Sequence, residues 1–158
     1  MRGMMKTVIS AVALLLIGTV SLHAACTVTG TDLDFGTYDT NDGSVTDGVG
    51  NVNVHCTFLL AIALHYTVKL STGGSGTYSP RQMAGPNASY PLEYNLYTNS
   101  SRSIVWGDGS GVTGYNEFSS LLGLLVHDRN YPVYGRIPAQ QNVPPGSYSD
   151  TITVTVEY

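Results

Sequence analysis

The chain has 158 residues, of which 11% are charged, and its formal net charge is −4. This length is typical of one domain. The acidic balance argues against nucleic acid, whose phosphates need a cationic face, and two cysteines without a nearby histidine pair do not form a zinc site.

The first 24 residues predict a secretory signal peptide. Arg2 and Lys6 precede an apolar run over residues 8–20, and Ala24 stands at a plausible cleavage site. The run is too short to span a membrane, which takes about 20 residues. Cleavage after Ala24 leaves residues 25–158 as one domain without a membrane span. This domain keeps five basic and eleven acidic residues, a net charge of −6 that favours solubility.

Cys26 and Cys56 are the two cysteines, and a disulfide is the default pairing in an exported chain. The bond closes a loop of about 30 residues, which contributes roughly 3–4 kcal/mol of stability in the chain-entropy model. A lipid anchor on Cys26 is the weaker interpretation, because His23 stands where lipoprotein signals usually carry an aliphatic residue.

The rest of the chain predicts strands, since no stretch shows sustained helical periodicity. Apolar and polar residues alternate in segments 51–56, 66–70, 92–97 and 152–158. Turn signals separate them at residues 41–43, 72–74, 85–87, 107–109 and 144–146. The last strand is expected to run from Tyr148 to the final residue, Tyr158. This pattern predicts an all-β protein, an antiparallel β-sandwich.

Catalytic chemistry has little support in the sequence. The domain has three histidines (His55, His65 and His127), each in a context typical of structural or surface groups. His127 is followed by Asp128, but no nucleophile motif such as Gly-x-Ser-x-Gly accompanies them. We also find no paired-carboxylate motif for glycoside chemistry. We therefore expect neither enzymatic activity nor a cofactor.

Three other sites have competing interpretations. Residues 39–43 hint at a calcium loop but lack its spacing and its closing glutamate, so we predict a turn. Trp106 could bind a sugar through its indole face, although a fold feature at a strand end is the simpler explanation. Asp150 is expected to be a local hydrogen-bonding group rather than a catalytic acid.

Ten segments in order resemble one family and together cover almost the whole domain. They are residues 26–28, 33–38, 52–56, 68–71, 73–78, 81–83, 92–97, 105–109, 133–141 and 145–150. The chain is similar to the spore coat protein U domain family, to which Csu-type subunits of archaic chaperone–usher pili belong. The positions that carry the family motifs are Trp106, Gly107, Asp108, Gly109, Arg136, Pro138, Gly146, Tyr148 and Asp150.

The resemblance implies an immunoglobulin-like sandwich that is incomplete, with one strand supplied in trans. A periplasmic chaperone first inserts this strand, and the N-terminal extension of a neighbouring subunit replaces it in the fibre. Cys26 would tie the first strand to the strand that ends at Cys56. Ile152, Val154 and Val156 would line one wall of the acceptor groove. The alternative is that these three residues are ordinary core residues of a complete sandwich.

Two features depart from the family pattern. Polymerising subunits carry a donor segment before the first cysteine, whereas cleavage after Ala24 leaves only Ala25, which predicts a terminal (tip) position in a fibre or a role outside fibres. An apolar run also follows Cys56, and it is either an exposed surface-binding loop or a buried strand. The residues of this possible loop are Phe58, Leu59, Leu60 and Ile62. A second apolar run, residues 121–126, is predicted to be a buried strand.

The expected function is therefore structural and adhesive. The resemblance implies export through the periplasm to a surface pilus, with the pilus chaperone, the outer-membrane usher and neighbouring pilins as partners. It also implies attachment to abiotic or cell surfaces and biofilm formation. The alternatives are a secreted coat or matrix protein that does not polymerise, and a small carbohydrate-binding module that uses Trp106.

Overall fold

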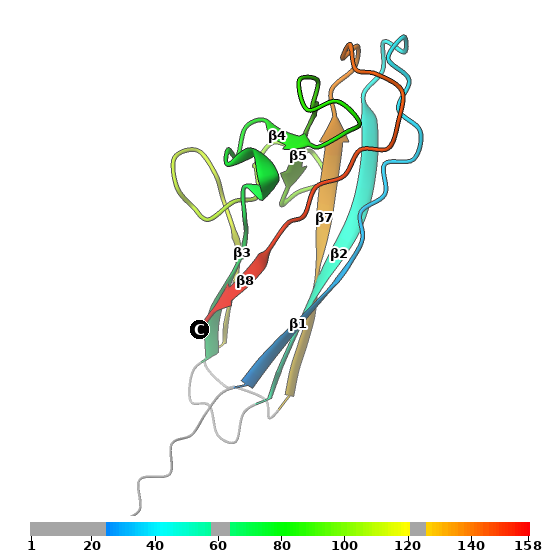
Figure 1. Ribbon diagram of the computed structural model, residues 1–158. Helices are drawn as coiled ribbons and strands as arrows, with labels where there is room; N and C mark the ends of the chain where they lie inside the picture. Colours follow the sequence, from blue (N-terminus) through cyan, green and yellow to red (C-terminus); the bar gives the residue numbers. More distant parts are fainter. Residues whose placement is uncertain (1–24, 58–63, 121–125) are drawn as a thin grey trace, which may run out of the picture.

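The computed structural model describes residues 25–57, 64–120 and 126–158 (Figure 1). These residues form β1 (Ala25–Thr31), β2 (Thr46–Thr57), β3 (Leu64–Leu70), β4 (Arg81–Met83), β5 (Leu92–Tyr97), β6 (Asn116–Ser120), β7 (Val126–Ile137) and β8 (Val154–Glu157). A short 3-10 helix, Gly73–Ser75, follows β3. Within these ranges no α-helix is present, so none is available to cross a membrane.

The strands form two sheets that pack face to face. One sheet has five strands in the order β1-β2-β7-β5-β4, and the other has three in the order β6-β3-β8. Every pairing between these strands is antiparallel. The predicted all-β antiparallel sandwich is confirmed.

The alternation of apolar and polar residues predicted three strands correctly, because each of these strands buries one face. In β2, for example, Val52 and Val54 are 3% and 0% exposed, whereas the intervening Asn53 is only half-buried. The segments predicted at residues 51–56, 66–70 and 92–97 lie in β2, β3 and β5.

The last strand is much shorter than predicted. Only Val154–Glu157 pairs with β3, so the prediction is wrong for the residues before Val154. Ser149 instead exchanges two backbone hydrogen bonds with Ala84, beside β4. Thr153 then contacts Ser71 through two hydrogen bonds. The Thr153 carbonyl accepts from the Ser71 amide, and the Thr153 amide donates to the Ser71 hydroxyl. This stretch thus passes from the edge of one sheet to the other and does not extend the β8 ladder.

The core between the sheets is centred on aromatic side chains. Trp106 and Tyr66 are both 0% exposed. The indole nitrogen of Trp106 donates to the Val68 carbonyl oxygen at 2.8 Å, and its ring meets Tyr131 edge-on at a centroid distance of 6.5 Å. The buried indole therefore joins a loop to both sheets without leaving its polar atom unpaired.

A disulfide joins the first two strands. Cys26 and Cys56 face each other in the β1–β2 ladder, and their sulfur atoms are bonded, as predicted. The bond closes a loop with a sequence separation of 30 residues.

Replacing both Cys26 and Cys56 with serine is expected to lower the free energy of unfolding by about 3–4 kcal/mol, because the unfolded chain regains the entropy of the open loop. Urea unfolding can be followed through the fluorescence of Trp106, the one tryptophan of the chain, which is fully buried. Wild-type protein in reducing agent should unfold at the urea concentration of the double variant. Equal midpoints for oxidised wild type and variant would contradict the prediction.

Candidate binding groove

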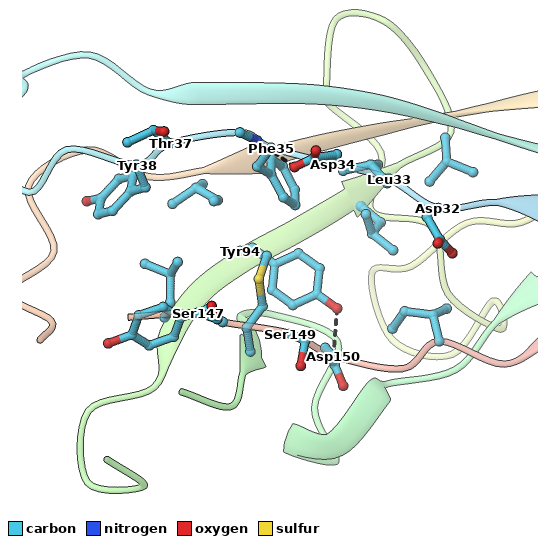
Figure 2. Close-up of a pocket in the computed structure, with 18 of the residues that line it drawn as sticks. Asp32, Leu33, Asp34, Phe35, Thr37, Tyr38, Tyr94, Ser147, Ser149 and Asp150 are labelled. Atoms are coloured by element: carbon cyan, nitrogen blue, oxygen red, sulfur yellow. Dashed lines mark hydrogen bonds between the residues drawn. The ribbon is translucent and has the colours of Figure 1, made fainter. Parts of the chain in front are cut away.

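A groove with a volume of about 1290 Å³ opens between two extended segments of the sandwich (Figure 2). One side is the N-terminal rim, residues 30–40, which follows β1. The other is the C-terminal rim, residues 143–150 together with Ile152 and Val154, which leads into β8. The floor between the rims consists mainly of apolar side chains from β3, β4, β5 and β7, namely Leu70, Met83, Leu92, Tyr94, Leu96, Val133 and Ile137.

The floor of the groove is continuous with the hydrophobic core. Leu92, Leu96 and Ile137 are 3%, 5% and 1% exposed and belong to the core cluster. Because close-packed core side chains sit in fixed rotamers, the floor presents a rigid apolar surface. Such a surface favours apolar side chains inserted from above.

The N-terminal rim lies against a pair of glycines. Gly48 of β2 and Gly135 of β7 are direct partners in the ladder. A Cβ at Gly48 would lie 2.8 Å from Leu33, and one at Gly135 would lie 2.6 Å from the Phe35 ring. Only residues without side chains allow this close approach of the rim to the sheet. Phe35 then reaches Tyr94 of the floor, edge-on at 6.1 Å between ring centroids.

Polar contacts fix the far end of this rim. The Tyr38 hydroxyl donates to the Pro138 carbonyl at 3.1 Å and accepts from the Gln141 amide at 2.7 Å. The Gln141 side chain in turn donates to the Glu93 carbonyl at 2.8 Å. The rim is therefore attached to the segment that follows β7 and, through it, to β5.

The C-terminal rim is held by Asp150, which contacts the floor residue Tyr94. One oxygen of this carboxylate accepts from the amides of Gly74 and Thr151, both at 2.8 Å. The other accepts from the Tyr94 hydroxyl at 2.7 Å, the bond drawn in Figure 2. Burial, reinforced by this bond to Asp150, raises the pKa of Tyr94, so the phenol stays protonated and donates.

Both sides of the groove expose unpaired backbone. β8 is the last strand of its sheet, with β3 as its neighbour. Within the described part of the chain, residues 32–38 form no hydrogen bond between backbone groups. An edge strand beside an apolar groove is a template for pairing with another extended segment.

A buried arginine stabilises the strands that carry the floor. Arg81 is 0% exposed, and its guanidinium donates to the carbonyls of Ser71 and Trp106 and to the Asn95 side chain at 2.7–3.1 Å. Burial lowers the pKa of Arg81, against the smaller opposing effects of nearby Tyr94, Tyr78 and Asp150. The planar fork satisfies three acceptors that belong to different segments, so it fixes β4, β5 and the Trp106 loop relative to one another.

Two of the three residues expected in the groove wall are at the groove. Ile152 and Val154 line it, whereas Val156 is not among the lining residues. Val156 pairs with Val68 of β3 further along β8 and packs against the core.

The motif positions at 106–109 form a tight turn that does not line the groove. Asp108 accepts from the Ser110 amide at 2.9 Å, and the Gly109 amide donates to the Thr113 hydroxyl at 3.1 Å. Gly107 is required here because a Cβ would lie 2.7 Å from Thr113. The burial of Trp106 removes the indole face that the sugar-binding interpretation needs.

The remaining motif positions lie at the groove or on the sheet beside it. Gly146, Tyr148 and Asp150 line the groove within the C-terminal rim. Arg136 instead forms a two-point ion pair with Asp47 at 2.8 and 2.9 Å on the other face of the β2–β7 pair. This hydrogen-bonded pair lowers the pKa of the Asp47 carboxyl, with a smaller contribution from the charge of Arg102.

The sites considered for catalysis or metal binding are separated by the fold. His127 contacts the Tyr66 hydroxyl at 3.1 Å, while its neighbour Asp128 contacts His55 at 3.4 Å. Residues 39–43 form a turn in which the Asp42 amide donates to the Asp39 carbonyl at 3.2 Å. Among the residues that the structure describes, no cluster of three or more metal-binding side chains occurs.

The possible surface-binding loop falls outside the described residues. Phe58, Leu59, Leu60 and Ile62 all lie in the range 58–63, and residues 121–125 of the second apolar run are also not described. Val126, the last residue of that run, begins β7 and is 52% exposed.

No role in a site was predicted for the N-terminal rim or for Arg81. A usable signal was present in the glycines at positions 48 and 135, since a glycine inside a strand often marks close backbone approach. Arg81 gave no such signal, because a single arginine between turn residues is typical of a surface position.

Comparisons with known proteins agree on one family. The pattern of the family described as Spore Coat Protein U domain matches residues 11–155. Protein U of Myxococcus xanthus is 36% identical over 136 residues, which are 82% of this chain and 73% of that protein.

Solved structures of similar fold come from pilus assembly. A chain in the CsuC–CsuE chaperone–tip adhesion subunit pre-assembly complex of Acinetobacter baumannii archaic chaperone–usher Csu pili is 26% identical, with a TM-score of 0.58. A chain in a chaperone–tip adhesin complex of CFA/I fimbriae biogenesis is 12% identical, with a TM-score of 0.52. The matches cover 86% and 83% of this chain but only 40% and 41% of those chains. The immunoglobulin-like class of the sandwich is confirmed.

Replacing Arg81 with lysine is expected to destabilise the domain by about 2–3 kcal/mol, because a single ammonium group cannot satisfy three separated acceptors and leaves at least one of them unpaired. Arg129 is exposed and lies over the rings of Phe118 and Tyr131, so Arg129→Lys is the matched control and should change stability little. Urea unfolding of both variants measures the difference. Equal free energies of unfolding for Arg81→Lys and Arg129→Lys would show that the buried guanidinium group is dispensable.

Proposed function

Because the chain belongs to the Spore Coat Protein U domain family, we propose that it is an exported subunit of an archaic chaperone–usher pilus. In this proposal the groove accepts an extended strand, first from a periplasmic chaperone and then from a neighbouring subunit delivered through the outer-membrane usher. Residues 1–24 are the signal peptide and residues 25–158 the mature pilin domain. The role is structural and adhesive and involves no catalytic step.

The apolar groove beside an unpaired strand edge is the observation that carries this proposal. Its floor is apolar, both rims are extended, and among the described strands β8 has a neighbour on one side only. Strand addition uses these features directly, since main-chain bonds supply affinity and alternate side chains enter the groove. The similarity to chains from two chaperone–tip adhesin complexes supports the same mode of assembly.

A position at the tip of the fibre is the finer part of the proposal. One similar structure is a complex of a chaperone with a tip adhesion subunit. The predicted cleavage site after Ala24 fits this position, because a mature chain that begins beside Cys26 accepts a strand without donating one. Attachment to surfaces and biofilm formation follow from this position, with residues 58–62 as the proposed surface contact.

The competing function is that of a coat or matrix protein that does not polymerise. The name of the family, Spore Coat Protein U domain, favours this alternative. In that case the sandwich is complete and stable without a partner, and Ile152, Val154 and Val156 are ordinary core residues. The two functions therefore differ in whether the domain needs a strand in the groove.

A donor strand fused after Tyr158 through a flexible linker is expected to stabilise the mature domain. The bare domain should melt at the lower temperature, and the fusion should raise Tm by at least about 10 °C, because the apolar side chains of the donor leave water when they enter the groove. A fusion of equal length with serine at every apolar donor position is the control. If the bare domain is soluble, melts cooperatively and gains nothing from the donor, the coat-protein alternative replaces the pilus proposal.

The exported protein is expected to begin at Ala25. Expression of the full chain in a bacterial host, followed by intact-mass measurement of the periplasmic product, should give the mass of residues 25–158 with both cysteines oxidised. A product that retains a donor-length segment before Cys26 would contradict the tip position, since such a subunit can also polymerise.

A further inference from the structure

Over the described ranges, all the charged side chains that line the groove are acidic. Asp32, Asp34 and Asp39 belong to the N-terminal rim and Asp150 to the C-terminal rim, whereas no lysine or arginine of these ranges lines the groove. The floor is apolar, so this negative charge is concentrated at the rims of the binding surface.

The basic residues of the domain are all placed elsewhere. Lys69 pairs with Glu157, and both Arg102 and Arg136 pair with Asp47. Arg129 lies over two aromatic rings, and Arg81 is buried and does not line the groove. Within the described part of the chain, no ion pair involves an aspartate of the groove.

The four aspartates differ in how far they are engaged. Asp150 accepts three hydrogen bonds, and Asp39 accepts from the Asn41 amide within a turn. Asp34 accepts a single bond from the Gly36 amide at 2.8 Å. Asp32 makes no hydrogen bond or ion pair among the described residues. Asp32 and Asp34 thus retain most of their capacity for an external partner.

Asp32 and Asp34 also have the spacing of one face of an extended chain. Both are exposed, while the alternating residues Leu33 and Phe35 are partly buried against the core (Figure 2). Residues two apart in a strand are separated by about 6.6–6.8 Å and point to the same side. A second strand beside the rim repeats this spacing, so its outward side chains can face both carboxylates.

We infer that the groove selects a donor strand whose inward residues are apolar and whose outward residues are lysine or arginine, spaced two apart to face Asp32 and Asp34. This inference rests on the proposed function, in which the groove accepts a strand. The apolar floor provides affinity for any donor of suitable shape. The acidic rim then discriminates among donors, because opposite charges across an interface favour one partner and repel another.

The test uses the fused-donor protein with three donors that differ only at their outward positions, which are all lysine, all glutamate or all serine. At low salt the lysine donor should melt roughly 5 °C above the glutamate donor, with serine between them. Salt at 0.5 M should at least halve the gap, because it screens exposed charges.

Variants of the rim assign the effect to its residues. In the Asp32→Asn, Asp34→Asn variant, the difference in Tm between the lysine and glutamate donors should fall to less than half of its wild-type value. Asp42→Asn removes an exposed acidic residue outside the groove lining and should leave the gap unchanged.

The outcomes separate this inference from the proposed function. If all three donors stabilise the domain equally, or if the gap survives in the Asp32→Asn, Asp34→Asn variant, the charge selection is overturned while strand acceptance stands. If no donor stabilises the domain, strand acceptance fails and the inference fails with it.

Discussion

The structure depends on an unequal pairing of two sheets. A sheet of five strands faces a sheet of three, so the smaller sheet cannot cover the whole inner face of the larger one. The uncovered part lies over β4, β5 and the end of β7, where the side chains are apolar. Two extended segments border this area without closing it. The groove forms because these two borders do not meet above the apolar side chains, and the other features of the site follow from how the borders are held.

Polar contacts hold those borders apart while the floor stays apolar. Asp150 fixes the C-terminal rim to Tyr94 and Gly74, and Tyr38 fixes the N-terminal rim to the chain beyond β7. Arg81 links β4 to β5 and to the Trp106 loop. Asp150, Tyr38 and Arg81 already form hydrogen bonds with other groups of the chain, so none of them needs a ligand as a partner. The groove is therefore preorganised, and an incoming strand does not have to order its walls at the moment of binding.

The sequence predicted those parts of the fold whose signal lies within one segment. Alternation located β2, β3 and β5, because each has one buried and one solvated face. The same rule overextended the last strand, since Ile152 also alternates with polar residues although its segment leaves the ladder. The N-terminal rim was missed for a different reason. Leu33 and Phe35 pack on Gly48 and Gly135, and a glycine contributes no apolar residue to a pattern. Arg81 was missed because its three acceptors come from distant segments.

The disulfide and the groove lie at different ends of β2, and this separation has a physical consequence. Cys56 is near the end of β2, whereas Gly48 and Gly50, against which the N-terminal rim packs, are near its beginning. The disulfide restricts the unfolded chain at one end, so part of the stability of the sandwich is independent of any strand in the groove. At the other end, the groove stays open between fixed borders. A domain built in this way can retain its fold long enough to meet a partner, and burial of the partner's apolar side chains between the two borders then supplies free energy for binding.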